Sequence, residues 1–431
     1  MKKIVRYVSY LKFFGPGAIL ASMTIGAGNI VLAPRVGAWA APAYSALWIV
    51  TFAMITKGLI AYMATRYSLL SGEHIMDLFS RIPPRGWINL VTIFMGVVLL
   101  PFMIATFLTL LGNAMTLFTD LGNYFVWGVG IGLLIAFFGF FGSFKLLQMV
   151  QLVFALFLAI GAVIAVVLVN PDWFAIAFNL FNFQVPRVAS WVTAEDILTV
   201  PVLLQLAAVY GTMNGTYTDF IAYIAWWRNK VNKKKIKPSS EAMKGMKIDL
   251  FISLLLVALF TVAFMAAGTV ILGEMKHAVP NGVDLISAQQ SIYNTIAPLM
   301  GSCIYPIAVL VVIGGTMYAG MDALPRMVKV TLDPLSERIR SWSFKRFQGV
   351  LVLYLVVTSL PLMLIEKPII LMTLYLFISG VIGFCLFGWG ALWANQRHLP
   401  KKLRFRKSMF ILLLISNIIL TIFTILIFIV K

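Results

Sequence analysis

The stretch Gly26-Ala27-Gly28-Asn29 interrupts an apolar run from Gly15 to Ala38, and Gly211-Thr212-Met213-Asn214-Gly215 interrupts a second run from Ile197 to Trp227. Each run is long enough to cross a membrane, and each contains glycine and asparagine near its middle. Such a break frees backbone carbonyl and amide groups, which a bilayer tolerates only where they line a cavity or meet a substrate. Two broken spans in corresponding positions of two halves indicate the binding site of a secondary transporter.

The composition is that of an all-α polytopic membrane protein. Hydrophobic residues make up 61% of the 431 residues, and charged residues only 11%, whereas soluble proteins carry roughly 25% charged residues. No long polar stretch is left for a second domain, so we expect one transmembrane domain over residues 1–431. The sequence has no nucleophile elbow, phosphate loop or zinc-spaced histidine set, which argues against an enzyme, an ATP-driven pump and a resident cofactor.

A transmembrane helix needs about 20 apolar residues, and eleven segments of the chain meet that requirement. They are residues 15–38, 43–65, 88–115, 123–142, 147–169, 196–227, 248–273, 293–321, 347–365, 368–394 and 408–430.

The basic residues predict the orientation of these spans. The chain has 34 Lys and Arg against 15 Asp and Glu. If the N-terminus is cytoplasmic, the outer segments hold only Arg187, Lys276, Lys367 and Lys431, as the positive-inside rule requires. We therefore expect a plasma-membrane protein with its N-terminus in the cytoplasm and its C-terminus outside. The positive charge then faces the lipid bilayer, and nucleic acid is not an expected partner.

Two loops have a distinctive composition. The inner loop 66–87 contains Ser71-Gly72 and is expected to form a turn and a short interfacial helix. The outer loop 170–195 is rich in Trp and Phe, which favour the outer membrane interface. The three histidines, His74, His277 and His398, all map to loops, and we expect them to be solvated.

The first two spans resemble those of Nramp-type metal transporters. That family carries a Gly-Pro-Gly opening, an Asp-Pro-Gly-Asn break and a closing Gly-Ala, and this chain has Gly15-Pro16-Gly17, Gly26 to Asn29, and Gly37-Ala38. Residues 64–73 are similar to the cytoplasmic end of the family's second helix. The resemblance implies the LeuT-type fold, with residues 15–169 and 196–394 as inverted repeats and 408–430 as an extra helix. It also implies transport of a divalent metal ion with a coupling ion, H⁺ or Na⁺.

The chain departs from the family pattern at the positions that bind metal. The family's aspartate falls on Gly26, although its asparagine is kept as Asn29. The family's Met-Pro-His-Asn falls on Thr212 to Gly215 or one residue later, so its methionine is either replaced by Thr212 or kept as Met213. The third span, 88–115, has no acidic residue, whereas the family places proton-pathway carboxylates there.

The candidate substrate site consists of neutral oxygen donors with one acid and one base. Its expected members are Gly26, Ala27, Asn29, Arg35, Thr212, Met213, Asn214, Gly215 and Asp219. Asn29 and Asp219 are the expected metal ligands. Asp219 is a cation ligand or proton acceptor, the partner of Arg35, or a group facing an outer water cavity. Lys57, midway along the second span, is expected to snorkel or pair, and the methionines are expected to pack.

The leading functional prediction is uptake of a cation by alternating access. Mg²⁺ fits better than Mn²⁺ or Fe²⁺, because Mg²⁺ keeps much of its water and needs no thioether ligand. The first alternative is an ion-coupled transporter of a small organic solute, such as a carboxylate held by Arg35. A second alternative is a non-transporting membrane sensor, against which the lack of a soluble domain argues.

Overall fold

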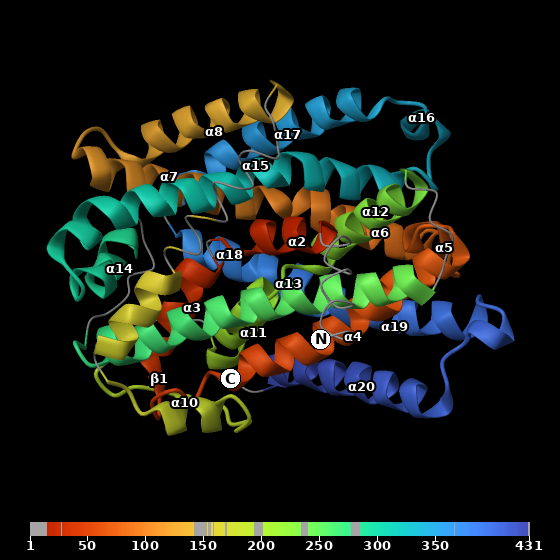
Figure 1. The fold of residues 1–431 in the computed structure, drawn as a ribbon. Coiled ribbons are helices and arrows are strands. Elements are labelled where there is room, and N and C mark those ends of the chain that lie inside the picture. The colour runs from red at the N-terminus through yellow and green to blue at the C-terminus, as the bar shows by residue number, and fades with distance from the viewer. Residues whose placement is uncertain are drawn as a thin grey trace.

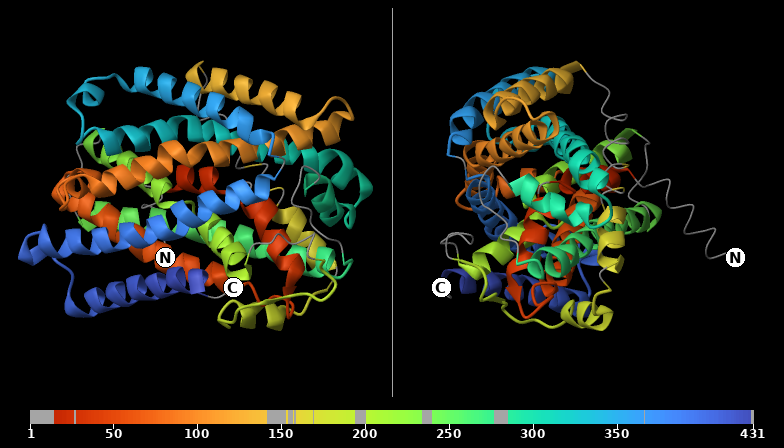
Figure 2. Two further views of the ribbon diagram at one scale, coloured as in Figure 1. Left: turned by 180° about the vertical axis from the view of Figure 1, so that it is seen from behind. Right: turned by 90° about the vertical axis from the view of Figure 1, so that its left-hand side faces the viewer.

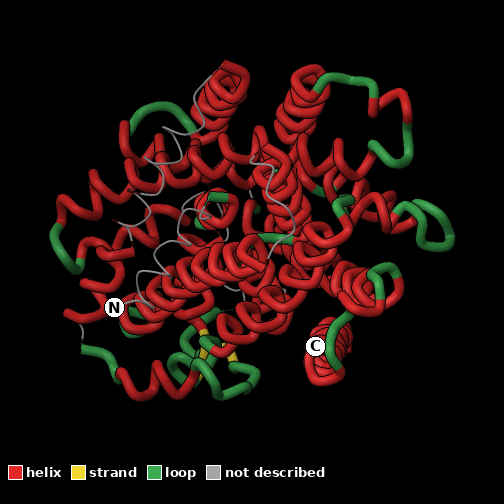
Figure 3. The backbone as a smooth tube through the Cα atoms, turned by 45° about the vertical axis from the view of Figure 1, so that its right-hand side comes forward, coloured by secondary structure: helices red, strands yellow, loops and turns green. Residues whose placement is uncertain are grey.

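Long apolar helices form a bundle in which most of them run roughly parallel to one another (Figure 1). This computed structural model describes residues 15–26, 28–141, 153, 157, 159–168, 170–193, 201–233, 240–276, 285–365 and 367–429. Helices dominate the described chain, and its strands are two short pieces (Figure 3).

Within the described residues, seven helices are long and apolar enough to span a membrane, or eight if the bent first span is counted. The seven are α4 (Trp48–Ser71), α6 (Trp87–Ile93) with η3 (Phe94–Val98) and α7 (Leu100–Thr119), α13 (Ser240–Ala267) with η4 (Gly268–Gly273), η5 (Met300–Ile304) with α15 (Tyr305–Leu332), α17 (Phe344–Met363), α18 (Pro368–Phe377) with η6 (Ile378–Ile382) and α19 (Gly383–Arg397), and α20 (Lys407–Ile429).

The other expected spans correspond to shorter helices. The segment 123–142 forms α8 (Tyr124–Phe141), and 196–227 forms the pair α11 (Val202–Thr212) and α12 (Tyr217–Lys233). Of 147–169, the helix at 159–168 is described, and much of the remainder lies outside the described residues. A total of eleven spans therefore stays a prediction.

The connecting elements lie at opposite ends of the bundle. Helices α5 (Ile75–Phe79) and α16 (Glu337–Arg340) are at one end, while α10 (Trp173–Asn179) and α14 (Leu285–Asn294) are at the other (Figure 1). Strand β1 (Ala40–Ala41) pairs antiparallel with β2 (Arg187–Val188) and so joins the first span to the loop that carries α10. These ends agree with the predicted alternation of loops, and which end faces the cytoplasm stays a prediction.

One local prediction was wrong. The eighth span was expected at 293–321, but α14 ends at Asn294 and the spanning helix runs from Met300 to Leu332. Pro298 follows the interruption and begins the next helical stretch, a position where the N–H that proline lacks is not needed. The short helix α5 forms where it was expected and buries Ile75 and Phe79 against the bundle, and its place at the membrane interface stays a prediction.

The eighth span continues through a proline because a neighbouring helix supplies the lost hydrogen bond. Pro325 lies inside α15, so the carbonyl of Met321, one turn earlier, receives no helical N–H. The side chain of Gln348 on α17 donates to that carbonyl at 2.7 Å. This bond also holds α17 against α15.

The two broken spans lie between the outer helices. Helices α8 and α17 are on one side of the bundle and α20 is on the opposite side, in both views of Figure 2. Helix α2 (Pro16–Thr24) contacts α12 and α15, while η2 (Gly28–Leu32) contacts α11. The break of the first span therefore lies against the break of the second.

Candidate functional site

The first break separates α2 from η2 and the following helix α3 (Ala33–Trp39), and the two parts are bent by 45°. Gly28 is required by close approach, because a Cβ atom there would lie 2.0 Å from Cγ2 of Thr212. Thr316 on α15 satisfies one of the freed carbonyls, donating to the oxygen of Ile25 at 3.0 Å. Ala27 lies outside the described residues.

The second break lies between Thr212 at the end of α11 and Tyr217 at the start of α12. Asn214 and Gly215 have φ values of 58° and 80°, a left-handed conformation that asparagine and glycine adopt most readily. Gly215 also contacts the first span, because a Cβ atom there would lie 2.6 Å from Cγ2 of Thr24. Both breaks therefore depend on glycine where they meet.

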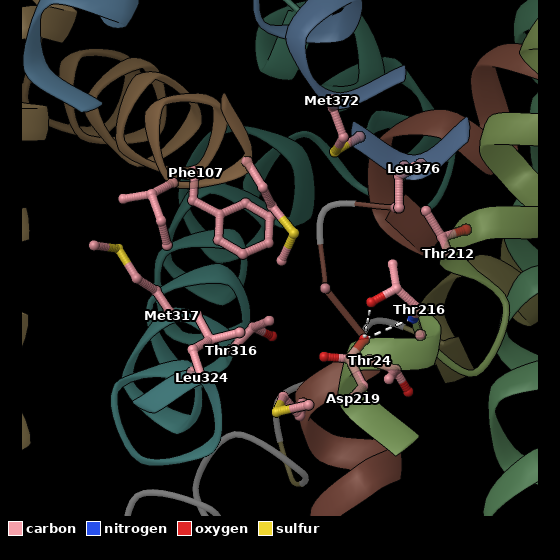
Figure 4. A pocket seen from close by; sticks show the side chains of 17 residues that line it. Thr24, Phe107, Thr212, Thr216, Asp219, Thr316, Met317, Leu324, Met372 and Leu376 are labelled. Atoms are coloured by element: carbon pink, nitrogen blue, oxygen red, sulfur yellow. Dashed lines mark hydrogen bonds between the residues drawn. The ribbon is translucent and has the colours of Figure 1, made fainter. Parts of the chain in front are cut away.

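A small cavity lies between the two breaks (Figure 4). Its volume is about 50 Å³, which is room for a few water molecules. Its polar wall comes from both broken helices and from α15. The polar side chains are Thr24, Thr212, Thr216, Thr316 and Asp219. The cavity can therefore hold a small, partly hydrated solute among hydroxyl groups and one carboxylate.

Asp219 closes the N-terminus of α12 and lines the cavity with the same side chain. Its Oδ2 accepts hydrogen bonds from the backbone N–H of Thr216 at 2.6 Å and from the Thr216 hydroxyl at 3.1 Å. The hydroxyls of Thr216 and Thr218 are 2.5 Å apart, and each lies 3.4 Å from the hydroxyl of Tyr375 on α18. The carboxylate is thus held at the helix start, where the helix dipole favours negative charge.

Four of the expected site residues line the cavity: Gly26, Thr212, Gly215 and Asp219. Of the two alternatives for the family's methionine, Thr212 lines the cavity and Met213 does not.

Three further expected residues are buried but do not line the cavity: Asn29, Asn214 and Arg35. The Asn29 amide donates to Thr261 Oγ1 on α13 at 2.6 Å, because η2 packs against that helix. The described hydrogen bonds of the Asp219 carboxylate come from Thr216, and its pairing with Arg35 stays a prediction.

At the first break, where the family has an aspartate, Gly26 is packed closely against Thr316. A Cβ atom on Gly26 would lie 2.9 Å from Oγ1 and 3.0 Å from Cγ2 of Thr316. An aspartate at this position therefore requires the threonine to move. The described residues contain no group of three or more His, Cys, Asp or Glu side chains that could hold a metal ion, so a metal here must rely on neutral donors as well.

Methionine was assigned to packing, but four methionines line the cavity: Met23, Met103, Met317 and Met372. They come from α2, α7, α15 and α18, and Figure 4 labels two of them, Met317 and Met372. No pattern within one helix distinguishes them from the other methionines. Thioether sulfur is a soft ligand, so the cavity offers both hard oxygen and soft sulfur atoms.

Lys57 does not snorkel, contrary to expectation, and among the described residues its ammonium bonds to carbonyl oxygens and not to a carboxylate. Its side chain on α4 is 0% exposed. Its ammonium donates to the carbonyl oxygens of Gly211 at 3.0 Å, Met213 at 2.7 Å and Gly215 at 2.7 Å. The only signal in the sequence was a charge in the middle of an apolar span.

The end of α2 away from the break is held by a second buried carboxylate. Asp249 on α13 accepts hydrogen bonds from the backbone N–H groups of Gly15, at 3.1 Å to Oδ1, and Gly17, at 2.8 Å to Oδ2. Its Oδ2 also accepts from the Tyr223 hydroxyl and from Nε1 of Trp227, both at 3.0 Å. One side chain of α13 thus joins the start of α2 to the middle of α12.

The histidines differ from expectation in one case. His74, expected to be solvated, is 0% exposed. Its Nδ1 accepts from the backbone N–H of Met76 at 3.2 Å, so Nε2 carries the proton and donates to the carbonyl of Ile221 on α12, also at 3.2 Å. Burial lowers the pKa of His74 to about 3. His398 is exposed as expected, and His277 lies outside the described residues.

Comparison with known proteins matches the chain to one family over almost its whole length. The profile of the family described as natural resistance-associated macrophage protein-like (Nramp) matches residues 17–430. A comparison with curated protein sequences gives no match.

Solved transporters share the fold. The manganese transporter of Eremococcus coleocola, solved in complex with an aromatic bis-isothiourea substituted compound, is 15% identical with a TM-score of 0.71, covering 98% of this chain and 87% of that one. MhsT in complex with L-phenylalanine is 16% identical with a TM-score of 0.60, covering 96% and 97%. Mhp1, a nucleobase-cation-symport-1 family transporter, is 16% identical with a TM-score of 0.57, covering 96% and 91%. The LeuT-type fold prediction is confirmed, and the repeat boundaries stay a prediction.

Proposed function

Because the chain belongs to the Nramp family of secondary metal-ion transporters, we propose that it moves a divalent metal ion by alternating access through the cavity between its two broken helices. The observation that carries the proposal is the position of Asp219. It is the one charged side chain among the described residues that line this cavity. A divalent ion needs such a charge, because dehydrating it among neutral groups alone is costly.

The acid has a different origin from the one that the family resemblance implies. The family's aspartate belongs to the first break, where this chain has Gly26 packed against Thr316. Here the carboxylate comes from Asp219, at the start of the half-helix after the second break. Both positions face the same cavity. We infer that the cation meets its counter-charge from the opposite broken helix.

The cavity favours Mn²⁺ over Mg²⁺ as the substrate. The expectation of Mg²⁺ assumed that the site lacks thioethers, and four methionines line it. Mn²⁺ accepts the same oxygen donors and tolerates softer ligands.

The organic-solute alternative has less support. A carboxylate substrate would need Arg35 at the site, and Arg35 is buried in α3 and does not line the cavity. No observation favours a non-transporting sensor. The coupling ion, H⁺ or Na⁺, stays open in this proposal.

The experiment is thermal unfolding of the purified full chain with two panels of ligands, divalent cations and small organic acids. Binding to the folded state raises the melting temperature by mass action. We expect a shift with Mn²⁺ that is lost in Asp219→Asn. The matched control is Asp120→Asn, at an exposed carboxylate after α7, which should keep the shift. A shift with an organic acid that disappears in Arg35→Gln, and none with metals, would contradict the proposal.

A further inference from the structure

The ammonium group of Lys57 is bound as a free cation would be. Its three N–H donors each meet a carbonyl oxygen, at 2.7, 2.7 and 3.0 Å. Ammonium has three donors and no acceptor, so its bonding capacity is filled. The group also lies 4.7 Å from the ring centroid of Tyr210 and 4.9 Å from that of Phe384, positions that favour a cation over an aromatic face.

The three acceptors belong to the unwound segment of the second span. Gly211 lies in the last turn of α11, Met213 follows that helix, and Gly215 precedes α12. The carbonyls at a helix C-terminus have no helical N–H partner and carry partial negative charge. Without a donor at this buried position, each would cost about 1–3 kcal/mol. Lys57 supplies the donor for three residues more than 150 positions away along the chain.

Broken helices of secondary transporters use such carbonyls to coordinate monovalent ions. In this chain the carbonyls are engaged by an ammonium that is covalently attached to α4. The donor group that occupies these carbonyls is thus a permanent part of the protein.

We propose that Lys57 is a tethered cation, which fills a latent monovalent-cation site at the second break and holds that break in its unwound form. A free Na⁺ or K⁺ is therefore not needed at this point. The inference does not rest on the identity of the transported substrate. It concerns the carbonyl cage formed by Gly211, Met213 and Gly215. It predicts that a variant without the Lys57 side chain needs an added cation to be as stable as the native chain.

The test is Lys57→Ala with chemical rescue by small cations. The purified full chain is unfolded thermally in ammonium, methylammonium, potassium, sodium or tetramethylammonium chloride at equal ionic strength. In tetramethylammonium, the variant should melt at least about 5 °C below the native chain, because three buried carbonyls lose their donor. Ammonium or methylammonium, which reproduce the donor, should restore most of that loss. The native chain should melt at the same temperature in all five salts.

Two further variants make the test specific. Lys57→Met has similar length without charge, fills the side-chain space, and should lose stability without any rescue. Lys247→Ala is the matched control, because Lys247 is on α13 but exposed, and its melting temperature should not depend on the salt. If Lys57→Ala does not fold in ordinary buffer, the yield of monodisperse protein from expression and purification in ammonium replaces the melting temperature. Recovery in ammonium but not in tetramethylammonium supports the proposal.

Three results would overturn the proposal: Lys57→Met as stable as the native chain, equal effects of ammonium and tetramethylammonium on Lys57→Ala, or no recovery of Lys57→Ala in ammonium. None of these results depends on metal binding. The proposal that Lys57 is a tethered cation is therefore tested separately from the proposal that the substrate is a metal ion.

Discussion

Asp249 should act as a latch for the first half of the broken span, and Asp249→Asn should release it. Alternating access requires α2 to move relative to its neighbours at one end of the bundle. In the structure that movement breaks the two hydrogen bonds from Gly15 and Gly17 to the Asp249 carboxylate. A hydrogen bond to a charged group contributes about 1.5–3 kcal/mol, and the dipole at the start of α2 adds about 0.3–1 kcal/mol.

The size of the effect follows from which oxygen accepts each bond. Three of the donors, Gly17, Tyr223 and Trp227, use Oδ2, and only Gly15 uses Oδ1. An asparagine oxygen at the Oδ2 position keeps three bonds, now to a neutral acceptor, and its NH₂ group opposes the N–H of Gly15. The two bonds to α2 then lose about 3 kcal/mol together. That shifts the ratio of released to latched α2 by roughly a hundredfold.

The assay is the labelling rate of a cysteine at Thr24, which lines the cavity from α2, by an impermeant maleimide added at the end where α5 and α16 lie. Cys303 and Cys385 are first replaced by alanine. Asp249→Asn should speed labelling at least tenfold with little change in the melting temperature. Asp322→Asn, which removes an ion pair with Arg326 on α15, is the control and should not. An unchanged rate in a folded Asp249→Asn protein would refute the latch.

Three other outcomes are expected. Gly26→Asp should destabilise the fold by about 1–3 kcal/mol through overpacking. Adding Thr316→Ala should recover part of that stability, since it relieves the overlap but also removes the donor to the Ile25 carbonyl, and it should tighten Mn²⁺ binding at least tenfold in a thermal titration. A double variant that binds Mn²⁺ no more tightly than the native chain would show that Thr316 does not occupy the space of the aspartate. Burial lowers the pKa of His74 to about 3 from about 6.5 in the unfolded chain. The folding stability contributed by the neutral imidazole is therefore complete above pH 6.5, and each unit of pH below that removes up to about 1.4 kcal/mol of it. His74→Asn should flatten this part of the plot of melting temperature against pH, and parallel plots for the two proteins would contradict the reasoning. Gln348→Leu should cost about 1–3 kcal/mol in denaturant unfolding, but much less with Pro325→Ala, which restores the helical donor; equal costs in both backgrounds would show that the bond is not the cause.

Helix positions could be predicted because each span must satisfy its backbone groups internally across a fixed thickness of hydrocarbon. The same constraint located both breaks. It did not locate the ends of the eighth span, since α15 continues through Pro325 only because Gln348 on another helix supplies a donor. Hydropathy within one segment contains no information about such a partner.

Only part of the site could be predicted, and the rest was missed for a related reason. Asp219 and Thr212 were found because they lie in or beside a break, where freed backbone indicates a cavity. The roles of Lys57 and the cavity methionines were missed, because each depends on contacts between helices distant in sequence. A charge within an apolar span indicates function, but it does not identify carbonyls more than 150 residues away as its partners. His74 was misjudged likewise, because its acceptor is on α12.

In the proposed transport cycle, Asp219 supplies the counter-charge for the divalent cation. The most direct measurement is uptake of Mn²⁺ into proteoliposomes that contain the native chain, Asp219→Asn or Asp120→Asn, each checked for equal reconstitution. We expect uptake above that of empty liposomes for the native chain and Asp120→Asn, and a loss of at least tenfold for Asp219→Asn. Uptake by Asp219→Asn equal to that of the native chain would contradict this role of Asp219.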